Sequence, residues 1–407
     1  MTGRALKTES RDKTKKNQSQ PLNGSFWTSP RKTSLRRWSF YIHFYAGLIA
    51  GILFSVVGIT GSILVFVPEL RVLEVPGHAA VRPTGQPLPL ETLLQVVRKS
   101  RPNDFIESFS SASERDSFEL TPDKALNFRS YSPTGERIQT FIDPYTGTII
   151  CQYNYNHRWL QKIYDLHENL LSGLTGKKIN AWFAMLLLIV SIAGLLLWWR
   201  GKKYWRLGLE YRIQASWKRQ MWDLHNLGGF LFSLPLLILA ITGIYYSYES
   251  QFATAAGALT HSPTSIRTPR SSVPGAKWRP IDDILRSSDK AAPDCKPTIF
   301  YFPKSSDASF YVRVRCPYDP HAVGLTYIYV DPPTARTTLV DRFYQEPSGM
   351  RIVRLMTPIH YGDVGGPFTR ILWIFIGVTP GILFVTSLLM WSNRSLSKKW
   401  SQRPSKL

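Results

Sequence analysis

Four histidines stand at matching positions in the two halves of the sequence, and their imidazole side chains could ligate a metal. His43 and His225 come near the start of apolar runs, whereas His167 and His360 come before apolar runs. Other residues repeat at the same offsets from these histidines: Gly47 and Thr60-Gly61 match Gly229 and Thr242-Gly243, and Gly173 and Trp198 match Gly366 and Trp391. Two whole sets of matches indicate a tandem internal duplication in which each half provides two histidines.

Paired imidazoles on facing helices are suitable axial ligands for b-type haem, which needs no cysteine attachment. We expect two such haems, one ligated by His43 and His225 and the other by His167 and His360. A glycine one turn after a histidine would leave room for a flat macrocycle, although small residues also allow close helix packing in membranes. The glycines expected to border the cofactors are Gly47, Gly229, Gly173 and Gly366.

Other roles for the histidines remain open. Zinc would need three or four ligands, and only Asp165, Glu168 and Asp363 could add to the second pair. Proton transfer and a purely structural role are further alternatives. His78, His157, His261 and His321 fall outside the repeat, and we expect them to be surface residues. Arginines near the membrane boundary could hold haem propionates or only set topology: Arg36, Arg37, Arg219 and Arg370.

Four apolar runs must position the histidines, at about 40–67, 178–199, 226–248 and 368–391. At about 1.5 Å per residue, each run is long enough for a helix to cross a hydrocarbon core of about 30 Å. Because successive spans alternate in direction, His43 and His225 fall on one side of the membrane and His167 and His360 on the other. If the second helix is continuous, His167 lies near or just beyond the membrane surface.

The net charge of +22 is concentrated in three short segments, and this distribution argues against nucleic-acid binding. Segments 1–38, 200–220 and 392–407 hold 10, 7 and 5 Lys/Arg residues, against Glu9, Asp12 and Glu210. The positive-inside rule places all three segments in the cytoplasm and the large connecting domains outside. The polar N-terminal tail lacks the apolar core of a cleavable signal peptide, so we expect it to be disordered and the first span to act as an uncleaved signal.

These patterns predict a four-helix membrane bundle with two α+β extracytoplasmic domains. The expected segments are a disordered basic cytoplasmic tail at 1–36, spanning helices at 37–68, 161–200, 221–249 and 353–393 (the second and fourth including the outer histidine approaches), extracytoplasmic domains at 69–160 and 250–352, a basic cytoplasmic loop at 201–220 and a basic tail at 394–407.

Each of the two domains reads as one helix followed by four strands. In the first, we predict a helix at 88–100 and strands at 104–110, 117–122, 136–143 and 146–153; in the second, a helix at 279–288 and strands at 297–302, 309–315, 325–331 and 335–343. Cys295 and Cys316 flank the first two strands of the second domain. If these strands form a hairpin, the sulfurs face each other and could form a disulfide in an oxidising compartment. Cys151 has no partner.

The α-then-β unit, with an Asp-Pro-x-Thr turn at 143–146 and 331–334, resembles the PepSY module. Together with WSFYIHFYAGLIAG, DLHENLLSGLTG, DLHNLGGF and PIHYGDVGGP, the chain over about 36–393 resembles the PepSY-associated transmembrane-helix family. The resemblance implies a bacterial inner-membrane protein linked to siderophore uptake, and some family members are di-haem ferric-siderophore reductases. Thr386-Ser387 departs from the glycine expected there, and we expect this to affect packing rather than ligation.

No Rossmann, P-loop, hydrolase or zinc-protease motif occurs, so a reductase of this kind would take electrons from a quinol or a cytoplasmic donor. The expected function is a haem-dependent oxidoreductase that reduces an extracytoplasmic ferric siderophore and releases Fe(II), with lipid and siderophore-uptake proteins as further partners. One alternative is a non-catalytic membrane protein whose PepSY-like domains bind a peptide, a protease or an uptake partner. A transporter is disfavoured because the spans carry no central acidic residue.

Overall fold

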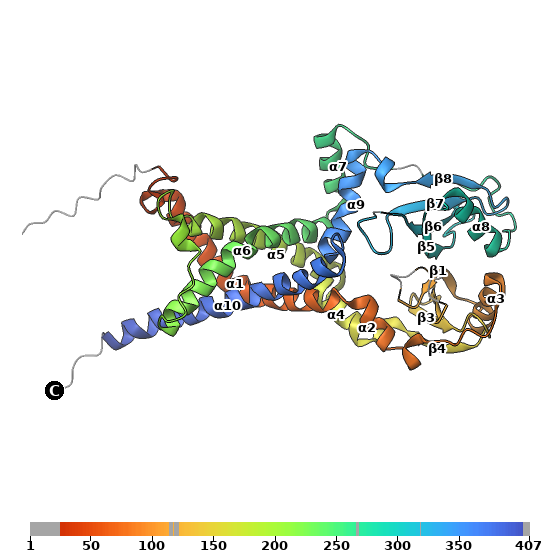
Figure 1. Ribbon diagram of the computed structural model, residues 1–407, viewed down its shortest axis with the longest axis horizontal. Helices are drawn as coiled ribbons and strands as arrows, with labels where there is room; N and C mark the ends of the chain where they lie inside the picture. The colour runs from red at the N-terminus through yellow and green to blue at the C-terminus, as the bar shows by residue number, and fades with distance from the viewer. Residues whose placement is uncertain (1–24, 114–116, 118–121, 266–267, 318, 402–407) are drawn as a thin grey trace, which may run out of the picture.

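A helical bundle forms one end of the molecule, and a β-sheet covered by two helices forms the other (Figure 1). The computed structural model describes residues 25–113, 117, 122–265, 268–317 and 319–401. Residues 1–24 of the predicted disordered tail and 402–407 of the predicted C-terminal tail lie outside this part. The basic loop at 201–220 lies at the end of the bundle away from the sheet (Figure 1). The first and last described residues lie at the same end.

Four helices are long and apolar enough to cross a membrane: α1 (Ser34–Leu64), α5 (Gly173–Trp198), α6 (Trp217–Tyr245) and α10 (Gly366–Ser401), the last over Gly366–Asn393. Helix α1 packs against α5 and α10, and α6 packs against the same two helices. The arrangement therefore places α1 and α6 across one diagonal of the bundle and α5 and α10 across the other.

The approaches to the second and fourth spans are separate helices, α4 (Trp159–Asn169) and α9 (Ser348–Tyr361). Left-handed backbone ends both helices, at Leu170 (φ 53°) and Gly362 (φ 72°). Such a residue stops a helix and redirects the chain. Helix α4 then lies against α1, and α9 lies against α6. The continuous helix considered for the second span is therefore not what forms.

Two short helices join the bundle to the sheet: α2 (Val67–Leu73) follows α1, and α7 (Glu249–Thr260) follows α6. Helices α7 and α9 pack against each other beside the second half of the sheet (Figure 1). The sequence patterns did not predict either short helix.

The two expected domains share one antiparallel sheet of order β4-β3-β2-β1-β5-β6-β7-β8. Its strands are β1 (Phe105–Ser111), β2 (Leu126–Tyr131), β3 (Arg137–Ile142), β4 (Ile149–Asn154), β5 (Lys296–Tyr301), β6 (Phe310–Arg315), β7 (Thr326–Val330) and β8 (Thr337–Asp341). The halves join where β1 pairs with β5, with Phe109 opposite Phe300. This pairing satisfies two strand edges that separate domains would expose. The two predicted α+β regions therefore form the two halves of one joined sheet.

Helices α3 (Leu90–Ser100) and α8 (Ile281–Ala291) cover the sheet face away from the bundle (Figure 1). Their N-termini cap each other. The backbone N–H groups of Leu90 and Glu91 donate to the carboxylate of Asp282, at 2.9 and 3.0 Å, and the N–H of Ile281 donates to the Glu91 carboxylate at 3.3 Å. Carboxylates at helix N-termini satisfy otherwise unpaired donors. The contact thus ties the two halves together above a shared core.

Most predicted strands match observed ones within a few residues. The exception is the predicted strand at 117–122, most of which lies outside the described residues; the second strand is instead Leu126–Tyr131. Strands β5 and β6 form the expected hairpin, with Lys296 opposite Arg315. Cys295 and Cys316 are joined by a disulfide at its open end, and Cys151 on β4 is a half-buried free thiol.

Candidate cofactor-binding histidine pairs

His43 on α1 and His225 on α6 meet across the bundle diagonal. Their ring centroids are 6.1 Å apart and the rings are nearly perpendicular, at 88°. The Nδ1 of His43 lies 2.9 Å from the carbonyl of Val190, and the Nδ1 of His225 lies 3.1 Å from the carbonyl of Leu383. Because a carbonyl can only accept, each Nδ1 must carry the proton. Each Nε2 is then left with a lone pair for a metal, as is usual for metal-binding histidines.

His167 on α4 and His360 on α9 form the second pair, with ring centroids again 6.1 Å apart and an interplanar angle of 53°. The Nδ1 of His167 donates to the carbonyl of Val57 at 2.9 Å. The Nδ1 of His360 lies 2.9 Å from the hydroxyl of Thr242, which donates its own proton to a backbone carbonyl of α6. The threonine oxygen therefore accepts from Nδ1, and both Nε2 atoms of this pair are again available.

The breaks after α4 and α9 set the depth of the second pair. Val57, the partner of His167, lies seven residues before the end of α1. At about 1.5 Å per residue, this puts the contact about 10 Å inside the sheet-side end of the helix. The separation of Val57 from His43 along α1 is about 21 Å on the same basis. Two imidazole pairs therefore lie at two levels within one bundle.

The spacing within each pair fits an iron porphyrin held between two imidazoles. Two imidazole–metal bonds of about 2 Å each, plus roughly 1 Å from each nitrogen to its ring centre, require about 6 Å between centroids. The observed 6.1 Å matches this value in both pairs. Within the described ranges, no cluster of three or more His, Cys, Asp or Glu side chains is placed to hold a metal ion. The zinc alternative therefore lacks a ligand set there.

Two glycines that were not assigned to the site touch the imidazoles directly. A Cβ built on Gly61 would lie 2.8 Å from Cε1 of His167, and one built on Gly194 would lie 3.0 Å from Cε1 of His43. Gly61 recurs as Gly243 in the repeated offsets, which was the available signal, whereas the counterpart of Gly194 in the second half is Ser387. Gly47 has no neighbouring atom within 4 Å of such a Cβ, so there is open space one turn after His43.

The remaining predicted glycines have two different settings. Gly229 also borders open space, one turn after His225. Gly173 and Gly366 instead begin α5 and α10 with left-handed backbone, at φ values of 57° and 64°. That backbone conformation favours glycine for steric reasons, which is enough to explain the choice of glycine at both positions.

The departure at Thr386 touches a candidate ligand. Its hydroxyl lies 3.1 Å from Nδ1 of His225, next to the Leu383 carbonyl that shares the same nitrogen. The expectation that this position affects only packing is therefore wrong, because the threonine helps to orient the imidazole.

Three of the four arginines considered for propionate binding are engaged with the protein. Arg370 forms a two-pronged ion pair with Glu69, at 2.7 Å for each contact, and Arg219 pairs with Asp223 at 2.9 Å. Arg36 donates to the carbonyl of Trp199 at 2.8 Å. These contacts explain the positions of the three guanidinium groups by helix packing and helix capping.

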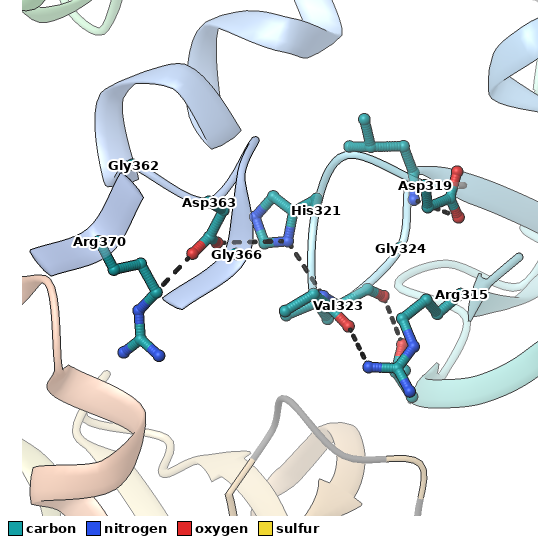
Figure 2. Close-up of polar contacts among 12 residues, drawn as sticks. Arg315, Asp319, His321, Val323, Gly324, Gly362, Asp363, Gly366 and Arg370 are labelled. Atoms are coloured by element: carbon teal, nitrogen blue, oxygen red, sulfur yellow. Dashed lines mark hydrogen bonds and ion pairs between the residues drawn. The ribbon is translucent and has the colours of Figure 1, made fainter. Parts of the chain in front are cut away.

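His321 differs from its prediction as a surface residue. His78, His157 and His261 are exposed as expected, whereas His321 is buried in the loop between β6 and β7. Its Nδ1 accepts from the N–H of Val323 at 3.0 Å and lies 3.8 Å from the buried carboxylate of Asp363, at the start of α10 (Figure 2). Asp363 is in turn 3.9 Å from Arg370. The group connects the sheet to the bundle just beyond His360.

Aromatic rings cover the sheet side of the second pair. The ring of Tyr246 lies 5.3 Å from that of His360, and Tyr246 and Tyr361 are stacked 6.4 Å apart. The Tyr245-Tyr246 pair ending α6 was visible in the sequence, but its position over a histidine depends on the separate helix α9.

The protein-family model described as the PepSY-associated TM region matches residues 40–394 of the sequence, which include all four paired histidines and the whole sheet. The chain belongs to this family. A search of curated proteins finds no match. Membership confirms the predicted resemblance, and the four apolar helices agree with a membrane protein.

Proposed function

We propose that this PepSY-associated protein is a di-haem oxidoreductase that moves electrons across the bacterial cytoplasmic membrane to a ferric siderophore. The observation that carries the proposal is the pairing of four imidazoles, two at each level, in which the hydrogen bonds of Nδ1 leave each Nε2 with a lone pair for a metal. Bound b-type haem would supply reversible one-electron chemistry, which no side chain of the chain supplies by itself.

The chain's own residues have distinct tasks in this proposal. His43 and His225 would hold the iron of one haem, and His167 and His360 would hold the iron of the other. Backbone carbonyls and threonine hydroxyls hold each ring in one tautomer and orientation, which strengthens ligation. The small residues Gly61 and Gly194 let the rings lie close to the neighbouring helices. Fixed ligation at two levels gives electrons a defined route along the bundle.

The charge distribution supports a direction. The described parts of the basic segments lie at the end of the bundle away from the sheet (Figure 1). His43 and His225 lie near the starts of α1 and α6, at that same end, and the positive-inside rule assigns this end to the cytoplasm. A quinol or a cytoplasmic protein would donate electrons there. The siderophore would be reduced on the sheet side, near His167 and His360, and Fe(II) would be released because siderophores bind it less tightly. Siderophore-uptake proteins are the expected partners on that side.

Anaerobic mixing of the dithionite-reduced full-length protein with ferric chelates tests this function. Ferric siderophores should reoxidise the haem within the mixing experiment, the iron-free siderophores should not, and an Fe(II) chelator should capture the product. The His360→Ala variant should lose fast reoxidation. Haem that stays reduced with every ferric siderophore would refute the assignment and favour a non-catalytic PepSY protein that binds a peptide, a protease or an uptake partner.

A further inference from the structure

A largely open basic cavity lies where the start of α1 meets the end of α5, and the proposed electron path does not use it. Its volume is about 280 Å³, and its lining is Arg31, Thr33, Arg36, Arg37, Phe40, Tyr41 and Leu197. Three arginines thus line one space that is large enough for a phosphate group together with part of the molecule that carries it.

Specific contacts fix the chain segment before α1 next to this cavity. The N–H of Lys202, just after α5, donates to the carbonyl of Trp27 at 3.1 Å. The rings of Trp27 and Trp199 meet edge-on, 5.9 Å apart. Arg36 also donates to the carbonyl of Trp199. The segment before α1 is therefore anchored on the end of α5, next to the residues that line the cavity.

The cavity carries positive charge without a compensating acid. Among residues that the structure describes, Arg31, Arg36 and Arg37 form no ion pair with a carboxylate. The first turn of α1 also lacks an acidic residue, although acidic groups stabilise helix N-termini. Guanidinium groups and a helix N-terminus are the two commonest phosphate-binding elements of proteins.

Two exposed aromatic side chains of α1 also line the cavity. Phe40 and Tyr41 line it, and each is 45% exposed on the outside of α1. This combination of cationic and aromatic side chains at the boundary of an apolar helix matches sites that hold lipid headgroups. We propose that the cavity binds a phosphate group that carries net negative charge and no attached cation, presented either by an anionic lipid headgroup or as free phosphate.

Native mass spectrometry of the full-length protein tests this site with three probes: dioctanoylphosphatidylglycerol, dioctanoylphosphatidylcholine and inorganic phosphate. Phosphatidylglycerol should bind more tightly than phosphatidylcholine. Competition by inorganic phosphate would assign recognition to the phosphate alone, and lack of competition would assign the site to lipid. Equal binding of the two lipids would overturn the proposal.

The double variant Arg31→Gln/Arg37→Gln removes two exposed charges and leaves the Arg36 contact with α5 intact. It should weaken phosphatidylglycerol binding about 30-fold, which corresponds to about 1 kcal/mol per arginine. The matched control Lys203→Gln/Lys218→Gln removes two exposed charges from the same end of the protein. An equal loss in the control would show general charge attraction and overturn the site.

Discussion

Replacing Gly61 by alanine would place a methyl group against the imidazole of His167. The added Cβ would lie 2.8 Å from Cε1 of His167, about 0.6 Å inside the 3.4 Å at which ordinary contacts begin. The ring must move or rotate, which strains its hydrogen bond to the Val57 carbonyl. Overpacking of this kind costs about 1–3 kcal/mol. We expect haem binding at the His167–His360 level to weaken by about 5- to 150-fold.

The equivalent position in the second half provides a matched control. A Cβ on Gly243 would lie 3.8 Å from Cε1 of His360 and 3.9 Å from Ala184, which is ordinary packing distance. Gly243→Ala should therefore keep full haem content, while Gly61→Ala should lose part of one haem per chain. Haem-to-protein ratio and haem-release rate measure both variants. Equal behaviour of the two variants would refute the inferred role of ring positioning.

Three further changes have defined outcomes. Thr242→Val removes the hydroxyl that accepts from Nδ1 of His360. The lost hydrogen bond is worth about 1 kcal/mol, so the variant should release haem about fivefold faster in a haem-transfer assay. Burial raises the pKa of Glu346 to about 8 from its ordinary value of 4.5, so the folded state keeps a proton that the unfolded chain releases. Stability should therefore fall as the pH rises from 4.5 to 8; thermal unfolding across pH should show this slope, and Glu346→Gln should lack it. Serine at both Cys295 and Cys316 opens a link across 21 residues and should destabilise the sheet by about 3 kcal/mol, seen as a lower unfolding temperature by circular dichroism; an unchanged temperature would contradict the stabilising role.

The repeated offsets were enough to predict which histidines meet, because spanning helices restrict where a residue can lie. The depth of His167 was not predictable in the same way. It depends on a left-handed residue at Leu170, and a non-glycine residue carries no clear sequence signal for that conformation. Gly362 at the equivalent break is a more readable signal, because glycine commonly ends helices.

The sheet shows a similar division between local and distant information. Alternating residues predicted most strands, since that pattern is local. The pairing of β1 with β5 brings Phe109 against Phe300. This pairing was not predicted, because a local residue pattern does not indicate which strand edges pair. The burial of His321 has the same origin, because Asp363 reaches it from a distant part of the chain.

Haem content and the visible spectrum of the purified full-length protein test the central claim most directly. Two haems per chain should be present, both low-spin and six-coordinate. His43→Ala and His167→Ala should each remove one haem and leave the other spectrum intact. Colourless protein, or haem content unchanged in both variants, would contradict the assignment of the imidazole pairs as haem ligands.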